Sequence, residues 1–191
     1  MYPRWMSEAS FSDLLERIDA DLADTARATG CGCGGVLHRA AYPRKPRGGP
    51  RELSAGYDRR LSFCCARRDC RQRRTPPSVR FLGRRVYLGA VVVLVSAMLH
   101  GPVPRRVATL GALLGVSRRT LERWRRWWGT TFAASPFWQA ARGRFARPPA
   151  PGLLPRSLLD RFTGDERDRL VATLRFLAPI TTAGVRPARA S

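Results

Sequence analysis

Five cysteines in two short clusters are the side chains of this sequence best suited to hold a metal ion. The first cluster lies in the glycine-rich segment 31–35 and the second in residues 64–70. Two tight turns that present thiolates to each other form the usual tetrahedral site of a structural zinc ion. We therefore predict that Zn²⁺ is bound by four ligands, Cys31, Cys33, Cys65 and Cys70.

The spacing of the cysteines leaves other arrangements open. Gaps of one and four residues replace the two-residue gap that is usual in zinc ribbons. Cys64 or His38 could replace one of the ligands, and a decayed ribbon with buried free thiols is a further alternative. An odd number of clustered cysteines, without a recognisable secretion signal, argues against a disulfide framework.

A second signal is a helix, a glycine turn and another helix between Val107 and Arg126. Gly115 stands at the turn, where a positive φ is often needed, and Ser117 is placed to cap the second helix. Gly111 is expected where the two helices cross closely. Three side chains are expected to point into the core, namely Val116, Leu121 and Trp124.

With those positions buried, the opposite face of the second helix carries mainly arginine. A recognition helix places its first residues against base edges in the major groove and later basic residues against phosphates. We expect this face to bind duplex DNA through Ser117, Arg118, Arg119, Thr120, Arg123 and Arg126. Further contacts to DNA are predicted for Arg84, Arg85, Arg105 and Arg106. The alternative is a plain helical hairpin whose glycine is only a turn.

The overall charge also points to a polyanionic partner. Lys and Arg number 35 against 14 Asp and Glu, which gives a formal net charge of +21. Between Arg59 and Arg126 there are 17 arginines and two acids, whereas residues 1–28 hold six acids and three arginines. A localised anion-binding face produces such an uneven distribution, and nucleic acid is the commonest partner of this kind. A membrane surface is the rival polyanion.

Groups suited to catalysis are sparse. Metal-dependent nucleases and transposases need carboxylates on a rigid core. The first acids after Glu122 are Asp160, Asp165 and Glu166, which fall on a predicted surface helix, and the two histidines are scattered. We therefore predict a chain that is not an enzyme and has no small-molecule substrate.

A group of aromatic residues follows the arginine-rich helix: Trp127, Trp128, Phe132, Phe137 and Trp138. Such rings can stack on unpaired bases, which would make the chain a binder of single-stranded nucleic acid. The favoured interpretation places them in the core behind the helical unit.

These signals predict a mainly α fold, in which a small zinc-ribbon-like β module precedes a tri-helical helix-turn-helix unit and C-terminal helices. An N-terminal segment, 1–30, contains an amphipathic helix from Ser10 to Ala28, with Ser10 or Ser12 as its cap. The β module, 31–78, is expected to contain short strands at residues 35–40 and 60–64. Few of its residues are apolar, so a metal would supply the missing stability.

The helix-turn-helix domain is predicted to span residues 79–146, with helices at 84–99, 105–114 and 118–128. A helical pair follows within residues 147–180, and residues 181–191 are expected to form a disordered tail. The apolar segment 86–99 is shorter than the about 20 residues that a spanning helix needs. We therefore expect a cytoplasmic, nucleoid-associated protein without membrane contact.

A zinc ribbon followed by a helix-turn-helix resembles the DNA-binding ends of bacterial insertion-sequence transposases and their accessory proteins. Residues 37–48 and 75–85 also look like a bacterial family associated with mobile elements, so the resemblance spans residues 30–145. It implies binding at the ends of a mobile element; transcription regulation is the other role open to such a duplex binder. A structural role is the alternative, in which the N-terminal helix recruits a separate transposase or mediates self-association.

Overall fold

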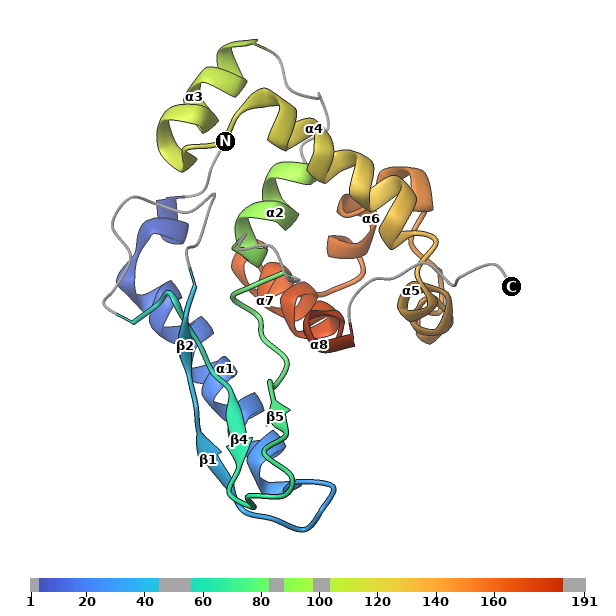
Figure 1. Ribbon diagram of the computed structural model, residues 1–191. Helices are drawn as coiled ribbons and strands as arrows, with labels where there is room; N and C mark the ends of the chain where they lie inside the picture. The colour runs from blue at the N-terminus through green and yellow to red at the C-terminus, as the bar shows by residue number, and fades with distance from the viewer. Residues whose placement is uncertain (1–3, 45–55, 83–87, 98–103, 184–191) are drawn as a thin grey trace.

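The computed structural model describes residues 4–44, 56–82, 88–97 and 104–183 of the 191-residue chain (Figure 1). It is mainly helical with a small antiparallel sheet, as the sequence predicts. The longer helices are α1 (Ala9–Ala28), α2 (Gly89–Ser96), α3 (Pro104–Leu114), α4 (Arg118–Trp127) and α7 (Glu166–Leu177). The shorter helical segments are η1 (Arg4–Ser7), the π-helical turn η2 (Trp128–Phe132), α5 (Pro136–Ala141), η3 (Arg142–Arg144), η4 (Pro151–Leu153), α6 (Arg156–Leu159) and α8 (Ile180–Ala183).

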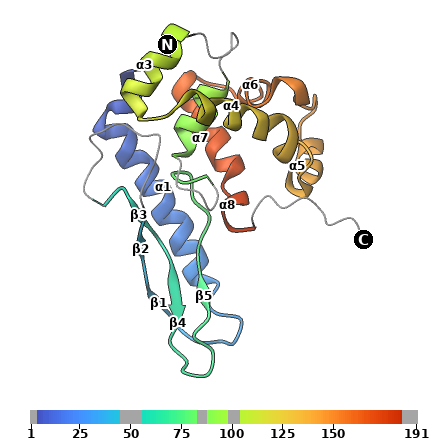
Figure 2. The same cartoon turned by 45° about the horizontal axis from the view of Figure 1, so that its top comes forward.

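α1 extends from the helical part of the molecule along the sheet and joins the two (Figures 1 and 2). Its apolar face, with Phe11, Leu15 and Ile18, is buried in the main core, as the amphipathic pattern predicts. Towards its C-terminal end, Ala23 packs against the sheet in a second, smaller core. The apolar face of α1 is therefore occupied within the chain itself.

The start of α1 differs from the prediction. The helix begins at Ala9 with Glu8 in the N-cap position, and no side chain caps its first turn. Ser10, one of the two expected caps, donates from its hydroxyl to the Glu8 carboxylate at 3.3 Å instead. The predicted serine cap is thus wrong, although the helix itself is confirmed.

The sheet consists of β1 (Leu37–Arg39), β4 (Phe63–Cys65) and β5 (Arg73–Arg74), all antiparallel and in the order β1-β4-β5. A second pair is formed by β2 (Tyr42–Pro43) and β3 (Arg59–Arg60). The strands predicted within residues 35–40 and 60–64 lie side by side, with Leu37 opposite Cys65. Because side chains alternate between the faces of a strand, Leu37, Phe63 and Cys65 share the face that packs on α1. Only a small apolar core lies beneath this sheet.

In the helical part of the molecule, α2 packs against α4 and α7. The α2 valines form the centre of this body, and Val91 and Val93 are at most 1% exposed. Leu170, Leu174 and Leu177 of α7 enter the same core. Of the helix expected at residues 84–99, the structure describes the part from Gly89 to Ser96. None of the helices in the described ranges is both long and apolar enough to cross a membrane.

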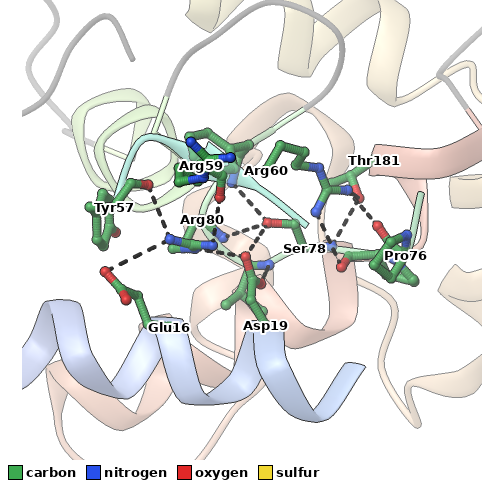
Figure 3. Close-up of polar contacts among 12 residues, drawn as sticks. Glu16, Asp19, Tyr57, Arg59, Arg60, Pro76, Ser78, Arg80 and Thr181 are labelled. Carbon is green, nitrogen blue, oxygen red and sulfur yellow. Dashed lines mark hydrogen bonds and ion pairs between the residues drawn. The ribbon is translucent and has the colours of Figure 1, made fainter. Parts of the chain in front are cut away.

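A buried polar network ties α1 to the segment that connects the sheet to the helical body (Figure 3). The Asp19 carboxylate accepts hydrogen bonds from the Ser78 hydroxyl at 2.6 Å, the Val79 amide at 2.7 Å and Arg80 Nε at 2.8 Å. Three donors around one buried carboxylate compensate for its lost hydration. The predicted boundary between residues 78 and 79 falls inside this network.

Arg80 carries the network into the sheet module. Its guanidinium donates to the backbone carbonyls of Tyr57 and Arg59, both at 3.0 Å, and lies 3.8 Å from the Glu16 carboxylate. The charged group also lies over the Tyr57 ring, 5.2 Å from its centroid. This buried cation thus contacts carboxylate and carbonyl acceptors as well as an aromatic ring.

The C-terminal helix α8 joins the same network through Thr181. The Thr181 hydroxyl accepts a hydrogen bond from the Ser78 amide at 3.0 Å and one from the buried Arg60 guanidinium at 3.4 Å. Arg60 also donates to the Pro76 carbonyl. The disordered tail was predicted to begin at Thr181, and that start is wrong; residues 184–191 lie outside the described ranges.

Candidate metal centre and nucleic-acid interface

Four thiols lie together at the end of the sheet module. The Sγ atoms of Cys31, Cys33, Cys65 and Cys70 all lie within 4.8 Å of one another. Two pairs are close, Cys31 with Cys70 at 3.6 Å and Cys33 with Cys65 at 3.5 Å, and all are free thiols. These are the four cysteines that the sequence predicts, and together they could hold a metal ion.

Two tight turns bring the thiols together. The first follows α1 directly and contains Gly34 at a φ of +77°. The second runs from Cys65 at the end of β4 to Cys70, after which Arg71 adopts a left-handed φ of +45°. Gly35 allows the two turns to meet, since a Cβ atom there would lie 2.6 Å from Cys65 Sγ.

Two arginines connect the second turn and the neighbouring strand to the first turn. Arg67 donates to the Cys33 carbonyl at 3.0 Å and also forms an ion pair with Asp69. Arg74, on β5, donates to the carbonyl of Gly30. Both contacts use backbone oxygens, so they fix the shape of the first turn rather than neutralise a side chain.

Hydrogen bonds, burial and thiol–thiol contacts separate the acidities of the cluster. A backbone hydrogen bond from Gly35, assisted by the neighbouring thiols, lowers the pKa of Cys33 to about 7. The Arg67 backbone amide lowers the pKa of Cys65, but burial and the adjoining thiols outweigh it and raise the value to about 12. For Cys70 a backbone hydrogen bond also lowers the pKa, while the thiols and burial raise it overall. Cys33 therefore ionises before Cys65 and Cys70.

The fifth cysteine stays outside the cluster. Cys64 precedes Cys65 on β4 and so points to the other face of the sheet, where its thiol donates to the Arg71 carbonyl at 3.5 Å. His38 stands opposite Cys64 in the register and is exposed. Neither belongs to the group of four. The structure thus gives no support to replacement of a ligand by Cys64 or His38.

The segment with the predicted recognition helix forms two helices, α3 and α4, that meet at an angle at one end of the molecule (Figure 1). Gly115 in the connecting turn has a φ of +63°, and the Ser117 side chain caps α4 by accepting from the Thr120 amide. The turn and α4 bury the three side chains predicted for the core, Val116, Leu121 and Trp124. Each of these local predictions is confirmed.

Gly111 does not have the predicted role. A Cβ atom at this position would meet only the Val116 carbonyl oxygen, at 3.4 Å, which is an ordinary van der Waals contact. No atom of α4 comes closer, so the helices do not need a glycine at this point. The expectation of a close crossing at Gly111 is wrong.

Three exposed arginines, Arg119, Arg123 and Arg126, follow one side of α4, and we call them the arginine face. Arg119 and Arg126 are separated by about two helical turns, so they project in the same direction. That direction is opposite to the one in which Leu121 and Trp124 enter the core. The side of α4 that faces away from the protein is therefore strongly positive.

Other predicted contact residues of α4 are engaged within the helix. Arg118 forms an ion pair with Glu122 at 2.8 Å, one turn further along. Thr120 is half-buried, and its hydroxyl lies 3.2 Å from that of Ser117 at the cap. These groups shape the start of the helix, and the arginine face is its exposed cationic surface.

The remaining predicted arginines are described only in part. Arg105 is exposed on the first turn of α3. Arg106 belongs to the same helix, but its side chain lies outside what the structure describes. Arg84 and Arg85 lie in residues 83–87, which are outside the described ranges.

The aromatic group after α4 belongs to the core. Trp128, Phe132 and Trp138 are at most 1% exposed, as the favoured interpretation predicts. Their rings pack on one another, with Trp128 and Phe132 in an edge-on contact at 4.8 Å between centroids. Trp127 and Phe137 are partly exposed and pack on the same cluster. These positions offer little free ring surface for stacking on bases.

Two of the three acids weighed as catalytic groups, Asp160 and Asp165, have structural partners. Asp165 caps α7 by accepting from the Asp168 amide at 2.8 Å, and the Asp168 side chain completes a capping box. Asp160 pairs with Arg156 and Arg169. Glu166 is exposed at the first position of α7.

The chain was compared with protein-family models, with curated proteins and with solved structures, and none of them matches it.

Proposed function

We propose that the chain binds duplex DNA through α3 and α4 as a helix-turn-helix, with a zinc ion in the cysteine cluster as a structural element. The observation that carries this proposal is the arginine face, which lies directly opposite the buried Leu121 and Trp124. A helix that is anchored on one side and cationic on the other suits the major groove.

The three arginines have the chemistry for two kinds of contact. A guanidinium binds a phosphate or the O6 and N7 atoms of guanine in a bidentate manner. Arg119 lies in the first turn of α4, where recognition helices reach base edges, and Arg126 lies at the other end, where phosphate contacts are usual. Arg119 is thus the proposed reader of sequence and Arg126 a proposed backbone contact.

A zinc ion fits the positions of the four thiols. A tetrahedral ion with Zn–S bonds of about 2.3 Å places its sulfur ligands about 3.8 Å apart. The observed pairs at 3.5 and 3.6 Å, with all four atoms within 4.8 Å, are close to that geometry. Because the module has only a small apolar core, the bound ion would supply much of its folding free energy.

The proposed biological role is recognition of the ends of a mobile element, with catalysis in a separate transposase. The order of the modules supports this role: a four-cysteine cluster precedes a basic helix pair, as in the transposase-associated proteins that the sequence resembles. Transcription regulation is the alternative role for the same DNA contact. Both place the chain on the nucleoid.

Selection of bound sequences from a random duplex pool, followed by affinity measurements on the selected site, tests the DNA contact. Arg119→Gln should relax the preference at one base pair, with a loss of about 1–3 kcal/mol on the selected site. Arg105→Gln should weaken binding evenly on all sequences, and Arg175→Gln, an exposed arginine of α7, is the control without effect. An equal loss on every sequence for Arg119→Gln would contradict its role as reader.

Metal analysis of the purified protein tests the zinc centre. The parent protein should contain about one zinc ion per chain, and Cys65→Ser should lose it. Cys64→Ser is the matched control and should retain the metal, because its thiol lies on the other face of the sheet. Equal zinc content in the two variants would contradict the assignment of the ligands.

A further inference from the structure

We propose that the second cysteine turn is a separate phosphate-binding surface, so that the chain contacts one duplex at two places about one helical turn apart. The surface consists of Arg68, Arg71 and Arg73, and we call it the turn surface. This inference rests on the proposed duplex binding by α4. It adds a second contact, made to phosphates, and a length for the DNA site that both contacts require.

The arginines that contact the first cysteine turn are not those of the turn surface. Arg67 and Arg74 serve the cysteine centre, because each donates to a backbone carbonyl of the first turn. The only acid within the second turn, Asp69, is already paired with Arg67 at 3.3 Å.

The arginines that remain are exposed. Arg68 and Arg71 have exposed side chains without an ion pair or hydrogen bond to another described residue. Arg73 extends over the Tyr42 ring, with its guanidinium 5.4 Å from the ring centroid, which holds the cation above the strand. Cations gathered on a turn without neighbouring acceptors suit phosphate oxygens, which carry charge but no sequence information.

The two proposed contacts lie at opposite ends of the molecule. Figures 1 and 2 both place the end of the sheet module far from α3 and α4, with α1 running between them. Since α1 has 20 residues, it spans about 30 Å. One turn of B-form DNA is about 34–36 Å long. The length of the helix between the two surfaces is thus close to one turn of a duplex.

Buried contacts join the sheet module to the helical body. Asp19 of α1 and Arg80 of the connecting segment form a buried ion pair within the network that also holds Thr181. A fixed spacing lets the second contact form as an intramolecular event once the first is made, which raises affinity without new sequence readout.

Binding to duplexes of two lengths tests the proposal. One duplex has about 10 base pairs, one turn, around the site of α4, and the other has about 24 base pairs, more than two turns. The test variant is the double substitution Arg68→Gln and Arg71→Asn, in which asparagine tolerates the left-handed backbone of position 71. The control is Arg147→Gln with Arg175→Gln, which removes two exposed arginines elsewhere.

On the long duplex the test variant should bind about 10-fold or more weakly in 0.1 M salt, with a log–log salt slope lower in magnitude by about 1.8. On the short duplex it should bind like the parent, and the control should match the parent on both. Zinc content and circular dichroism of each variant establish that the fold is kept.

Two results would overturn the inference. In the first, the test variant binds the long duplex with the affinity and salt slope of the parent, while Arg119→Gln loses sequence preference. This result would refute the turn surface and leave the proposed binding by α4 intact. Equal losses on the short and long duplexes would refute the one-turn spacing. Absence of duplex binding by the parent protein would instead refute the proposed function itself.

Discussion

Asp19 and Arg80 form an ion pair in the interior, with 2.8 Å between the carboxylate and Arg80 Nε and with both side chains at most 4% exposed. Removal of one partner from such a pair leaves an uncompensated buried charge. We therefore expect Asp19→Ala to lower the free energy of unfolding by about 3–5 kcal/mol, as measured by urea denaturation. Asp21→Ala, an exposed acid on the same helix, should change it by less than about 0.5 kcal/mol. Similar free energies of unfolding for the two variants would mean that the Asp19–Arg80 pair does not hold α1 to the connecting segment.

Gly35→Ala tests the contact between the two cysteine turns. The added methyl group would lie 2.6 Å from Cys65 Sγ and would push apart two of the four thiols. Zinc affinity, measured by competition with a chromophoric chelator, should fall about 10-fold or more. Gly32→Ala is the matched control, because nothing lies within 4 Å of a Cβ atom there. Unchanged affinity for both variants would show that the turns can separate without loss of the site.

The stability of the metal-free protein against urea should be highest near pH 9. Cys33 has a pKa lowered from 9.0 to about 7, so its stabilising contribution is complete above pH 9 and is lost as the pH falls through 7. Cys65 has a pKa raised to about 12, so its contribution is complete below pH 9 and is lost as the pH rises through 12. Urea midpoints in the presence of a chelator measure both limbs.

Cys33→Ser is the control for that profile. It should remove the rise in stability between pH 7 and 9 and retain the decline at higher pH, which belongs to Cys65. A profile of the parent protein that is flat between pH 7 and 9 would contradict the lowered pKa of Cys33.

Two glycines of the helix pair should respond to alanine in opposite ways. Gly115 has a left-handed φ of +63°, so Gly115→Ala should destabilise the protein by about 1–2 kcal/mol. Gly111 is helical and a Cβ atom meets only an ordinary contact, so Gly111→Ala should stabilise α3 by about 0.5–1 kcal/mol. Thermal unfolding of both variants checks the signs. Destabilisation by Gly111→Ala would instead support the close helix crossing that was expected from the sequence.

The residues that were predicted correctly have roles that depend on their own side chains and on the neighbouring backbone. Cysteines have few roles in short clusters, so their type indicated the group of four thiols that the structure brings together. Gly115, Ser117 and Trp124 occupy positions whose backbone or burial requirements are local, and the structure confirms them. Local requirements of this kind can be identified without knowledge of the rest of the fold.

The residues that were missed depend on distant partners. In the sequence, Asp19 resembles the other acids expected on the solvent-exposed face of an amphipathic helix. Its partners, Ser78 and Arg80, are 59 and 61 positions away. Thr181 looks like the start of a basic tail, yet its role is defined by Ser78. Gly111 was misinterpreted because a small residue in a helix fits both a close crossing and no crossing. Only the tertiary structure distinguishes such cases.

The bond between the Ser78 amide and the Thr181 hydroxyl joins residues 103 positions apart and affects the order of events during synthesis. The sheet module and its connecting segment leave the ribosome long before α8 exists, so this amide must stay hydrated while the helical body is being made. Contacts of such long range form late, after the loop between them has been closed. The contact between the connecting segment and α8 therefore forms only after α8 has been made, and a nascent chain that stops before α8 would lack it.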